Sequence, residues 1–527
     1  MDADYYYASG LRIATTGTWS EPFIWNYLND PQGLPHPSFS YWMPLAGIIS
    51  AFGIKLSGLN NFWGARIGFF LIAGFLAPLT SYLAYTFTPS KWAAILAAGL
   101  SLFSGFYFAY LPTTETFAVN MVLGCIFFLL VLRMQQDYER YSKDSEFHQN
   151  ELSISKGRLL SPPWIYIGLG LICGMMYMTR VDGVVWFGLG VAVVILQWVS
   201  GKNIEFRESR ISNGLFRILL PLALLIIPFI LIVSPWFIRN LDSFGTIFAP
   251  GSGRALWLTS YDEIFAYPAT NLTYERWLNS GVFGLLRDRG WALGLNTLTL
   301  FAVQGAVILL PLTLVGFWTN RNDWRVLLGI CGWLATFLVM TLIFPFQGAR
   351  GGFFHAGAGF QPLFWALVPA GLLIITNWVA VKRTWDASRA LKMFAVGTVI
   401  VIFIMTAFVT RQRLLGSGQT GSAWGSTEFS YQEVDSFLEN NGVSAEAVVM
   451  VNNPPGYYAM TGRQSIVIPH GDLQSALLAG RKFQASYLIL DKNYPQGLEE
   501  IYQNPGNYPG LQHLQTINQM QIYFIEQ

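Results

Sequence analysis

The stretch 216-FRILLPLALLIIPFILIVSPWF-237 contains one charged residue, Arg217, among apolar side chains and three prolines. A helix needs about 20 mostly apolar residues to cross roughly 30 Å of hydrocarbon. Because lipid cannot hydrogen-bond to backbone groups, apolar segments of this length cross it as helices. Nine further stretches have a similar length and composition, at 64–86, 92–110, 116–133, 162–179, 184–200, 297–318, 327–345, 359–380 and 392–410. The sequence therefore predicts a polytopic α-helical membrane protein with about ten visible spans.

The composition of the 527-residue chain agrees with this prediction, since 53% of its residues are hydrophobic and only 12% are charged. Soluble domains carry about twice that share of charged residues. The formal net charge is +2, which is far from the strongly basic balance of nucleic-acid-binding domains. We therefore expect membrane lipid as a partner and no nucleic acid.

Basic residues collect in alternate gaps between the spans, among them Lys91, Arg133, Arg140, Arg321 and Lys382. Because cytoplasmic loops are enriched in Lys and Arg, these gaps are expected in the cytoplasm. The other gaps are then extracytoplasmic, and they are the residues before 64, 111–115, 180–183, 238–296, 346–358 and the residues after 410. This topology places both chain ends outside, so we expect one more helix upstream and an internal Met1. An N-terminus that crosses the membrane unaided is the alternative.

The predicted topology divides the chain into four regions. Residues 1–62 form a first outside loop, rich in the aromatic residues typical of a bilayer surface, with an interfacial helix at 43–56. Residues 63–410 form the transmembrane domain, and 411–428, rich in Gly, Ser and Thr, form a linker. In 429–527, helical patterns alternate with short apolar strands, which predicts an extracytoplasmic α/β domain.

The candidate catalytic residues are three carboxylates in outside segments, Asp2, Asp4 and Glu115. Asp2 and Asp4 are one residue apart, a spacing that lets two carboxylates share a divalent cation or divide the roles of base and metal ligand. An ordinary solvated pair at a chain end is the alternative. Glu115 stands at the start of a span, where it suits either a site or simple stabilisation of the helix dipole.

The candidate phosphate ligands include Arg350 and His355, which lie among glycines in the outside loop 344–359. Glycine lets a backbone approach a ligand closely, and Arg holds a phosphate with two parallel hydrogen bonds. A flexible connector with a headgroup-binding Arg is the alternative.

Two further candidate phosphate ligands are Arg180 and His36. Arg180 lies between two spans, and charged groups at this depth often mark a site; an ion pair with Asp182 that braces the turn is the alternative. His36 lies in the Pro-bounded turn 35–44, where phosphate contact and a plain surface position fit equally well.

Together these residues resemble the motifs of the C-type membrane glycosyltransferases, especially the protein O-mannosyltransferase and lipid A aminoarabinose transferase group, family 39. Members of this group place an acidic motif in the first outside loop, which Asp2-Ala3-Asp4 resembles. Three more features resemble those of the family, namely the turn Pro35–Leu45, Arg180 between two spans and the run Pro235-Trp-Phe-Ile-Arg-Asn240. The resemblance covers most of 1–410 in layout.

This chain departs from the family pattern at two places. The usual acidic motif is an adjacent Asp-Glu, whereas here Ala3 separates two aspartates. That spacing is similar to the Asp-x-Asp of oligosaccharyltransferase catalytic subunits, which use a divalent cation, so Asp2 and Asp4 become its candidate ligands. The lysine of the aminoarabinose transferase turn is absent, and His36 stands nearest to its place.

The resemblance implies an inverting hexosyl- or pentosyltransferase of the plasma membrane. It would move a sugar from a polyprenyl-phosphate donor to a glycan, lipid or protein acceptor on the outer face. Asp4, or else Asp2, would be the general base, and Glu115 would orient the sugar, the acceptor or a cation. Arg350 and Arg180, with His355 and His36, would stabilise the leaving phosphate. Two alternatives are a transporter or flippase for a lipid-linked substrate and a non-catalytic binder of the carrier lipid.

Overall fold

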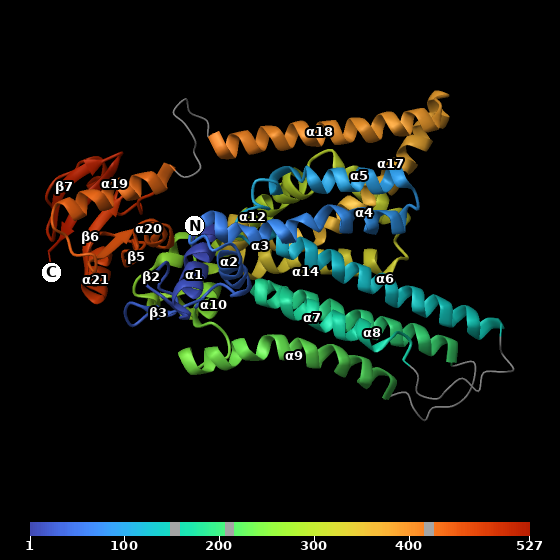
Figure 1. Ribbon diagram of the computed structural model, residues 1–527, viewed down its shortest axis with the longest axis horizontal. Coiled ribbons are helices and arrows are strands. Elements are labelled where there is room, and N and C mark those ends of the chain that lie inside the picture. The colour runs from blue at the N-terminus through green and yellow to red at the C-terminus, as the bar shows by residue number, and fades with distance from the viewer. Residues whose placement is uncertain (148–158, 206–215, 416–425, 527) are drawn as a thin grey trace.

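The computed structural model describes residues 1–147, 159–205, 216–415 and 426–526. Figure 1 shows a bundle of long helices with a mixed helix and sheet domain at one end, and α1 (Asp2–Thr16) lies where the two meet. Residues 148–158 and 206–215 of two predicted cytoplasmic gaps, and 416–425 of the predicted linker, lie outside the described residues.

The helices of the bundle confirm a multi-pass membrane protein. In the described ranges, seven helices are long and apolar enough to cross a bilayer, or eight if one bent pair counts as a single span. The predicted spans 92–110 and 162–179 correspond to apolar helices of 12 and 17 residues. The bundle contains α3 (Phe62–Gly74), α4 (Leu76–Phe87), α5 (Lys91–Leu102), α6 (Phe117–Phe147), α7 (Pro163–Thr179), α8 (Val184–Glu205), α9 (Phe216–Phe244), α12 (Gly281–Leu298), α13 (Leu309–Thr319), α14 (Trp324–Leu338), α17 (Gln361–Arg383) and α18 (Ala387–Leu415).

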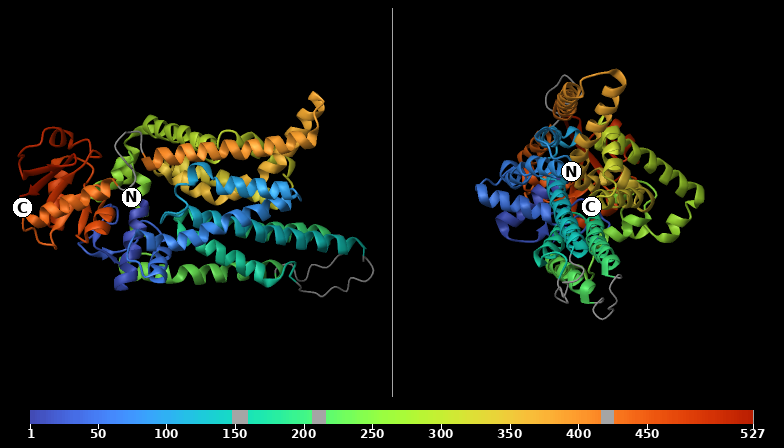
Figure 2. Two further views of the ribbon diagram at one scale, coloured as in Figure 1. Left: turned by 45° about the horizontal axis from the view of Figure 1, so that its top comes forward. Right: turned by 90° about the vertical axis from the view of Figure 1, so that its right-hand side faces the viewer.

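The charge asymmetry along the sequence corresponds to two ends of this bundle. The last turn of α17 contains Lys382 and Arg383, and it lies at the end opposite the C-terminal domain (Figures 1 and 2). Helix α1, with Asp2 and Asp4, lies at the other end. Acidic candidates and basic connections therefore occupy opposite ends of the helices.

The predicted span over 297–318 is a broken helix in the structure. α12 continues through η6 (Thr299–Gln304), and α13 then leaves at 89°. The backbone is left-handed at Ala306 and Val307, with φ of 42° and 56°, and a right-handed helix cannot pass through such residues. Trp333 Nε1 donates to the Gln304 side chain at 2.8 Å and Gln361 Nε2 donates to its backbone carbonyl at 2.9 Å, so polar partners compensate the break.

The segments predicted to lie outside contain more helix than expected. The expected loop 346–358 consists of the short turns α15 (Pro345–Gln347), η8 (Gly348–Gly352) and α16 (Phe353–Gly357). Gly351 has φ of 125°, a value open to glycine, and it interrupts the helical path beside Arg350. The long segment 238–296 contains the short helices α10 (Pro250–Arg254) and α11 (Tyr274–Leu278).

The first outside segment is folded onto the bundle. Its acidic motif begins helix α1 instead of lying in a loop, and α2 (Leu45–Ser57) is the predicted short helix near 43–56. Gly10 of α1 lies so close to α2 that a Cβ at this position would stand 2.4 Å from Ser50 Cβ. The absence of a side chain at Gly10 therefore allows the two helices to pack backbone against backbone.

The C-terminal region confirms the α/β pattern and adds a strand from the start of the chain. Its sheet has the order β2-β5-β4-β6-β8-β7, and β2, β5, β4 and β6 are parallel. Strand β2 belongs to the predicted first outside segment, and its residues pair with β5 residues 442 positions later (Phe23 with Ser465), so the two regions share one sheet. The elements are β1 (Ser20–Glu21), β2 (Phe23–Ile24), β3 (His36–Pro37), α19 (Ser426–Asn440), β4 (Val448–Val451), α20 (Pro454–Thr461), β5 (Ser465–Val467), α21 (Leu473–Phe483), β6 (Ala485–Leu490), α22 (Glu499–Gln503), β7 (Leu511–Ile517) and β8 (Met520–Ile525).

Candidate active site

The two aspartates of the acidic motif lie in the first turn of α1 and face different partners. Side chains two positions apart on a helix do not face each other. Accordingly, Asp2 Oδ2 lies 3.8 Å from His355 Nε2, whereas Asp4 Oδ2 accepts a hydrogen bond of 2.7 Å from Asn453 Nδ2. The helix thus directs one carboxylate toward the bundle and the other toward the C-terminal domain.

Asp2, Glu115 and His355 form a group that we call the acidic cluster. His355 Nε2 lies 3.8 Å from Asp2 Oδ2 and 3.8 Å from Glu115 Oε2. Thr116 Oγ1 lies 3.4 Å from the other ring nitrogen, and the ring stacks on Phe117 with centroids 4.1 Å apart. The imidazole is therefore fixed between two carboxylates that the sequence separates by more than a hundred positions.

The turn before α6 is joined directly to α1. Thr114 Oγ1 donates a 2.6 Å hydrogen bond to the carbonyl of Ala3, the residue between the two aspartates. From α3, Arg66 Nε donates a 2.6 Å hydrogen bond to the carbonyl of Pro112 in the same turn. These two bonds hold Glu115 beside the acidic motif, so its position is not explained by helix capping alone.

Burial determines the protonation of the acidic cluster. It raises the pKa of Glu115 to about 8, and the negative charges of Asp2 and Asp4 add to this increase while Arg180 opposes it. Burial also raises the pKa of Asp2, again opposed by Arg180. At neutral pH, Glu115 is therefore mostly a neutral acid that can donate a hydrogen bond.

Arg180 forms the ion pair that the sequence offered as its alternative role. Its Nε and Nη2 atoms donate to the two carboxylate oxygens of Asp182, at 3.0 Å to Oδ1 and 2.9 Å to Oδ2. Its positive charge nevertheless acts on both Asp2 and Glu115. Arg180 thus braces the turn between α7 and α8 and also lies within the electrostatic range of the acidic cluster.

Arg350 lies beside this group, in the helical break at η8. Its guanidinium is exposed and lies 5.2 Å from the centroid of the Tyr261 ring. Burial raises the pKa of Tyr261 to about 12, and the charges of Asp2 and Arg350 both act on this hydroxyl. Tyr261 is therefore within the electrostatic range of both Arg350 and Asp2.

His36 is not in this group. It is buried in β3, where its Nδ1 lies 2.8 Å from the Pro37 carbonyl and its Nε2 lies 3.8 Å from Glu21 Oε2. Burial lowers the pKa of His36 to about 4, so the ring is neutral at physiological pH. The structure thus gives His36 a buried place beside Glu21, where β1 pairs with β3.

The structure adds Asn453, Thr116 and Tyr261 to the candidates. Thr116 was visible in the sequence as part of the polar turn before a span, but its contact with His355 joins positions 239 apart. Asn453 and Tyr261 come from segments that show no local pattern typical of a site. Only the tertiary fold brings them to α1 or to Arg350.

A metal-binding arrangement is not evident in the described ranges, where no group of three or more His, Cys, Asp or Glu side chains could hold a metal ion. Asp2 and Asp4 face different partners, so the two do not form a preassembled pair of ligands.

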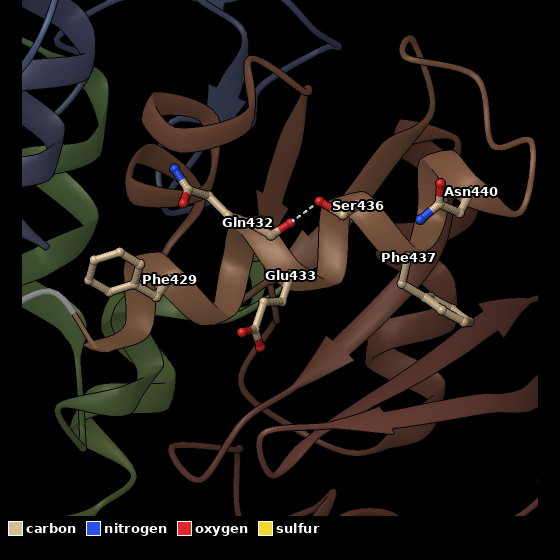
Figure 3. Close-up of a pocket in the computed structure, with 6 residues that line it drawn as sticks. All are labelled: Phe429, Gln432, Glu433, Ser436, Phe437 and Asn440. Carbon is tan, nitrogen blue, oxygen red and sulfur yellow. Dashed lines mark hydrogen bonds between the residues drawn. The ribbon is translucent and has the colours of Figure 1, made fainter. Parts of the chain in front are cut away.

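A shallow pocket along α19 lies apart from these residues (Figure 3). Its lining side chains point outward from one helix face, and Ser436 Oγ donates to the Gln432 carbonyl at 2.9 Å. The pocket is lined by Phe429, Gln432, Glu433, Ser436, Phe437 and Asn440. It contains none of the candidate residues, so the site is defined by the acidic cluster and not by this hollow.

Comparison with known proteins gives matches of structure. No protein-family model matches the chain, and no curated protein matches it. The structure of ArnT from Cupriavidus metallidurans bound to undecaprenyl phosphate is similar, with a TM-score of 0.52 and 11% identity over 99% of this chain and 93% of ArnT. The chain has the fold of the C-type membrane glycosyltransferases. The resemblance seen in the motifs is thus confirmed at the level of the fold.

A second protein with the C-type fold is the archaeal oligosaccharyltransferase AglB from Archaeoglobus fulgidus, solved in complex with an inhibitory peptide and a dolichol-phosphate. Its TM-score is 0.50 with 12% identity, over 93% of this chain. This chain spans 65% of the length of AglB. Because one fold hosts many chemistries, the reaction has to be argued from the residues of the site.

Proposed function

We propose that this protein is a membrane glycosyltransferase that moves a sugar, with inversion, from a polyprenyl-phosphate carrier to an acceptor hydroxyl on the outer face of the plasma membrane. The observation that carries the proposal is the convergence of Asp2, Glu115, His355 and Arg180, from four distant segments, at the end of the bundle beside the C-terminal domain. Two proteins with this fold were solved with polyprenyl-type phosphates, namely undecaprenyl phosphate and dolichol-phosphate.

In the proposed reaction, the acceptor hydroxyl gives its proton to Asp4, whose Oδ2 is held by Asn453 and whose Oδ1 is assigned to the acceptor. The acceptor oxygen attacks the anomeric carbon, and the bond from that carbon to the phosphate oxygen breaks on the opposite side. The electron pair of the broken bond stays on the phosphate. Asp2 is the second candidate for the base, because it lies in the acidic cluster next to Asp4.

The charge that develops on the departing phosphate needs preorganised positive groups. Arg350 is exposed at the helical break, so its guanidinium can turn from the Tyr261 ring to a phosphate. Arg180, already paired with Asp182, contributes its field at longer range. Neutral Glu115 and His355 supply hydrogen-bonding groups for the sugar or the phosphate between them.

The decisive experiment uses purified protein in lipid with a polyprenyl-phosphate donor that carries a radiolabelled sugar. Release of the label from the lipid in the presence of acceptor, and its dependence on Asp4 and Glu115, supports an enzyme. Donor binding without release of the label, whether or not acceptor is added, would indicate a non-catalytic carrier-lipid binder.

A transporter is the second candidate, and the helix broken at Gln304 to Leu309 is the observation that favours it. Broken helices near the membrane midplane are common in transporters. An assay of the same reconstituted protein distinguishes a transferase from a flippase, because a flippase would move labelled donor between leaflets without cleaving the bond between sugar and phosphate.

The dependence of the proposed reaction on a divalent cation is tested separately. The oligosaccharyltransferase from Archaeoglobus fulgidus was also solved in complex with Zn and sulfate, at a TM-score of 0.50 and 12% identity over 95% of this chain and 64% of that one. This is compatible with a cation in the fold, while the described residues here offer no ready ligand group. Transfer that survives a chelator is the expected result for this chain.

A further inference from the structure

Asn453 is the one residue of the C-terminal domain with a hydrogen bond to the acidic motif among the bonds of the described residues. It lies two residues after the end of β4 and immediately before α20, so it lies at the carboxyl edge of the parallel strands. Ligand sites of open α/β sheets form at that edge. Here the edge meets α1, the helix with Asp2 and Asp4.

Asn453 is the N-cap residue of α20, but helix capping explains the contact of only its side-chain oxygen. Asn453 Oδ1 accepts a hydrogen bond of 3.3 Å from Gly456 N, which is the normal task of an N-cap residue. Ser, Thr or Asp would perform this task as well. The amide nitrogen is not needed for the cap, yet it donates the 2.7 Å bond to Asp4 Oδ2.

The cap also determines which way the amide faces. Because the oxygen is engaged by the start of α20, the NH₂ group has to point toward α1. A hydrogen bond to a carboxylate is stronger than one between neutral groups, and it fixes one oxygen of Asp4 in place. The other oxygen, Oδ1, then has a defined direction.

The surrounding packing makes this a rigid connection. Strand β2 pairs with β5 of the C-terminal sheet, and Phe23 of β2 packs against Tyr458 of α20 with ring centroids 5.7 Å apart. The Tyr27 hydroxyl donates to the Val467 carbonyl in the same sheet. These contacts pack helix α1, strand β2 and helix α20 together around the hydrogen bond between Asn453 and Asp4.

We propose that Asn453 is a positioning residue for sugar transfer, which holds the Asp4 carboxylate in the orientation needed to take the acceptor proton. The C-terminal domain thereby completes the active site instead of serving only as a cover. This inference rests on the proposed transferase function, and it assigns a specific contribution to a domain whose role the family resemblance does not supply.

The test compares Asn453→Ser and Asn453→Asp in the full-length protein in lipid, with Asn452→Ala as the matched control. Both variants at 453 keep a capping oxygen and lose the donor to Asp4, and the Asp variant adds a negative charge beside it. Asn452 instead donates a hydrogen bond to Asp491 at the same sheet edge. Melting temperatures show whether each variant is folded.

We expect Asn453→Ser to lower kcat about tenfold with little change in the KM for acceptor, since one charge-assisted hydrogen bond is lost. Asn453→Asp should lower kcat further and move the acidic limb of the pH profile upward by about one pH unit or more, because a neighbouring carboxylate disfavours ionisation of Asp4. Asn452→Ala should keep the wild-type pH profile.

The outcomes separate the two proposals. A wild-type chain that transfers no sugar contradicts the function and this inference together. If the wild-type protein is active and Asn453→Asp has the same kcat and pH profile, the positioning role alone is overturned. A loss of kcat in both variants at 453 without the shift of the acidic limb would make Asn453 a purely structural residue and also overturn the inference.

Discussion

Replacing Glu115 by Gln should leave sugar transfer at neutral pH nearly intact, although a carboxylate at an active site is often assumed to act in its charged form. Burial and the charges of Asp2 and Asp4 raise the pKa of Glu115 to about 8. At pH 7, about nine in ten molecules therefore have a neutral Glu115. A glutamine amide is also neutral, has nearly the same shape and can donate a hydrogen bond to a sugar or phosphate oxygen.

The pH dependence provides the sharper measurement. Above its pKa, Glu115 becomes a third negative charge near Asp2 and an incoming phosphate. We expect kcat/KM of the wild type to fall about tenfold for each pH unit above 8, whereas the Gln variant keeps its activity there. The assay is release of radiolabelled sugar from the polyprenyl-phosphate donor at pH 6 to 9.5, in lipid, at limiting donor.

Glu115→Ala is the matched control, because it removes both the charge and the hydrogen-bonding group. It should lose about tenfold to a hundredfold in kcat/KM at pH 7. If Glu115→Gln is as impaired at pH 7 as Glu115→Ala, the reaction needs the ionised carboxylate. The neutral assignment, and the environment of the acidic cluster that leads to it, would then be wrong.

Three other substitutions test separate parts of the site. Asp4→Asn should keep donor binding and lose at least a hundredfold in transfer, because a general base contributes about 10²–10⁴; undiminished transfer would exclude Asp4 as the base. Arg350→Ala should weaken binding of labelled donor about tenfold to a hundredfold through the lost charge-assisted contact, and an unchanged affinity would remove Arg350 from the phosphate site. Glu21→Gln should relieve a pH-dependent loss of stability: burial raises the pKa of Glu21 to about 7 from 4.5, so its contribution is complete below pH 4.5 and is lost as the pH rises through 7. The midpoint of thermal unfolding of the variant, relative to that of the wild type, should therefore increase between pH 5 and pH 8, and a constant difference would contradict the raised pKa.

Much of the bundle could be predicted from the sequence because each span is a local property. Length and hydropathy alone indicate stretches such as 216–237, which lies within α9 in the structure. The break at Ala306 and Val307 could not be predicted in this way, because neither residue is typical of a left-handed backbone. Polar partners from α14 and α17 compensate that break, and they are tertiary contacts.

The C-terminal sheet shows the same division between local and tertiary information. Apolar runs such as Val448–Val451 are recognisable as buried strands. Strand β2 has two residues, Phe23 and Ile24, and no periodicity can be read from so few. Its pairing with β5 is decided by packing between regions at opposite ends of the chain, so the sequence suggested two separate domains.

Candidate residues could be named by chemical type, but their mutual geometry could not. Asp2 and Asp4 look like one unit in the sequence, and helix α1 turns them toward different partners. His36 looks like a companion of Arg350 because a histidine in a Pro-bounded turn is usually accessible. Instead, the β1–β3 pairing buries it beside Glu21.

The charges of the site explain why Arg350 matters more than its exposed position suggests. Two carboxylates that share one histidine in a desolvated cluster seldom both carry charge, and burial raises the pKa of both Glu115 and Asp2. Arg180 is compensated by Asp182 through a bidentate ion pair. Arg350 instead faces the ring of Tyr261, which carries no negative charge at neutral pH. A phosphate that enters beside the acidic cluster therefore finds in Arg350 the cation whose charge is not already balanced by a neighbouring carboxylate.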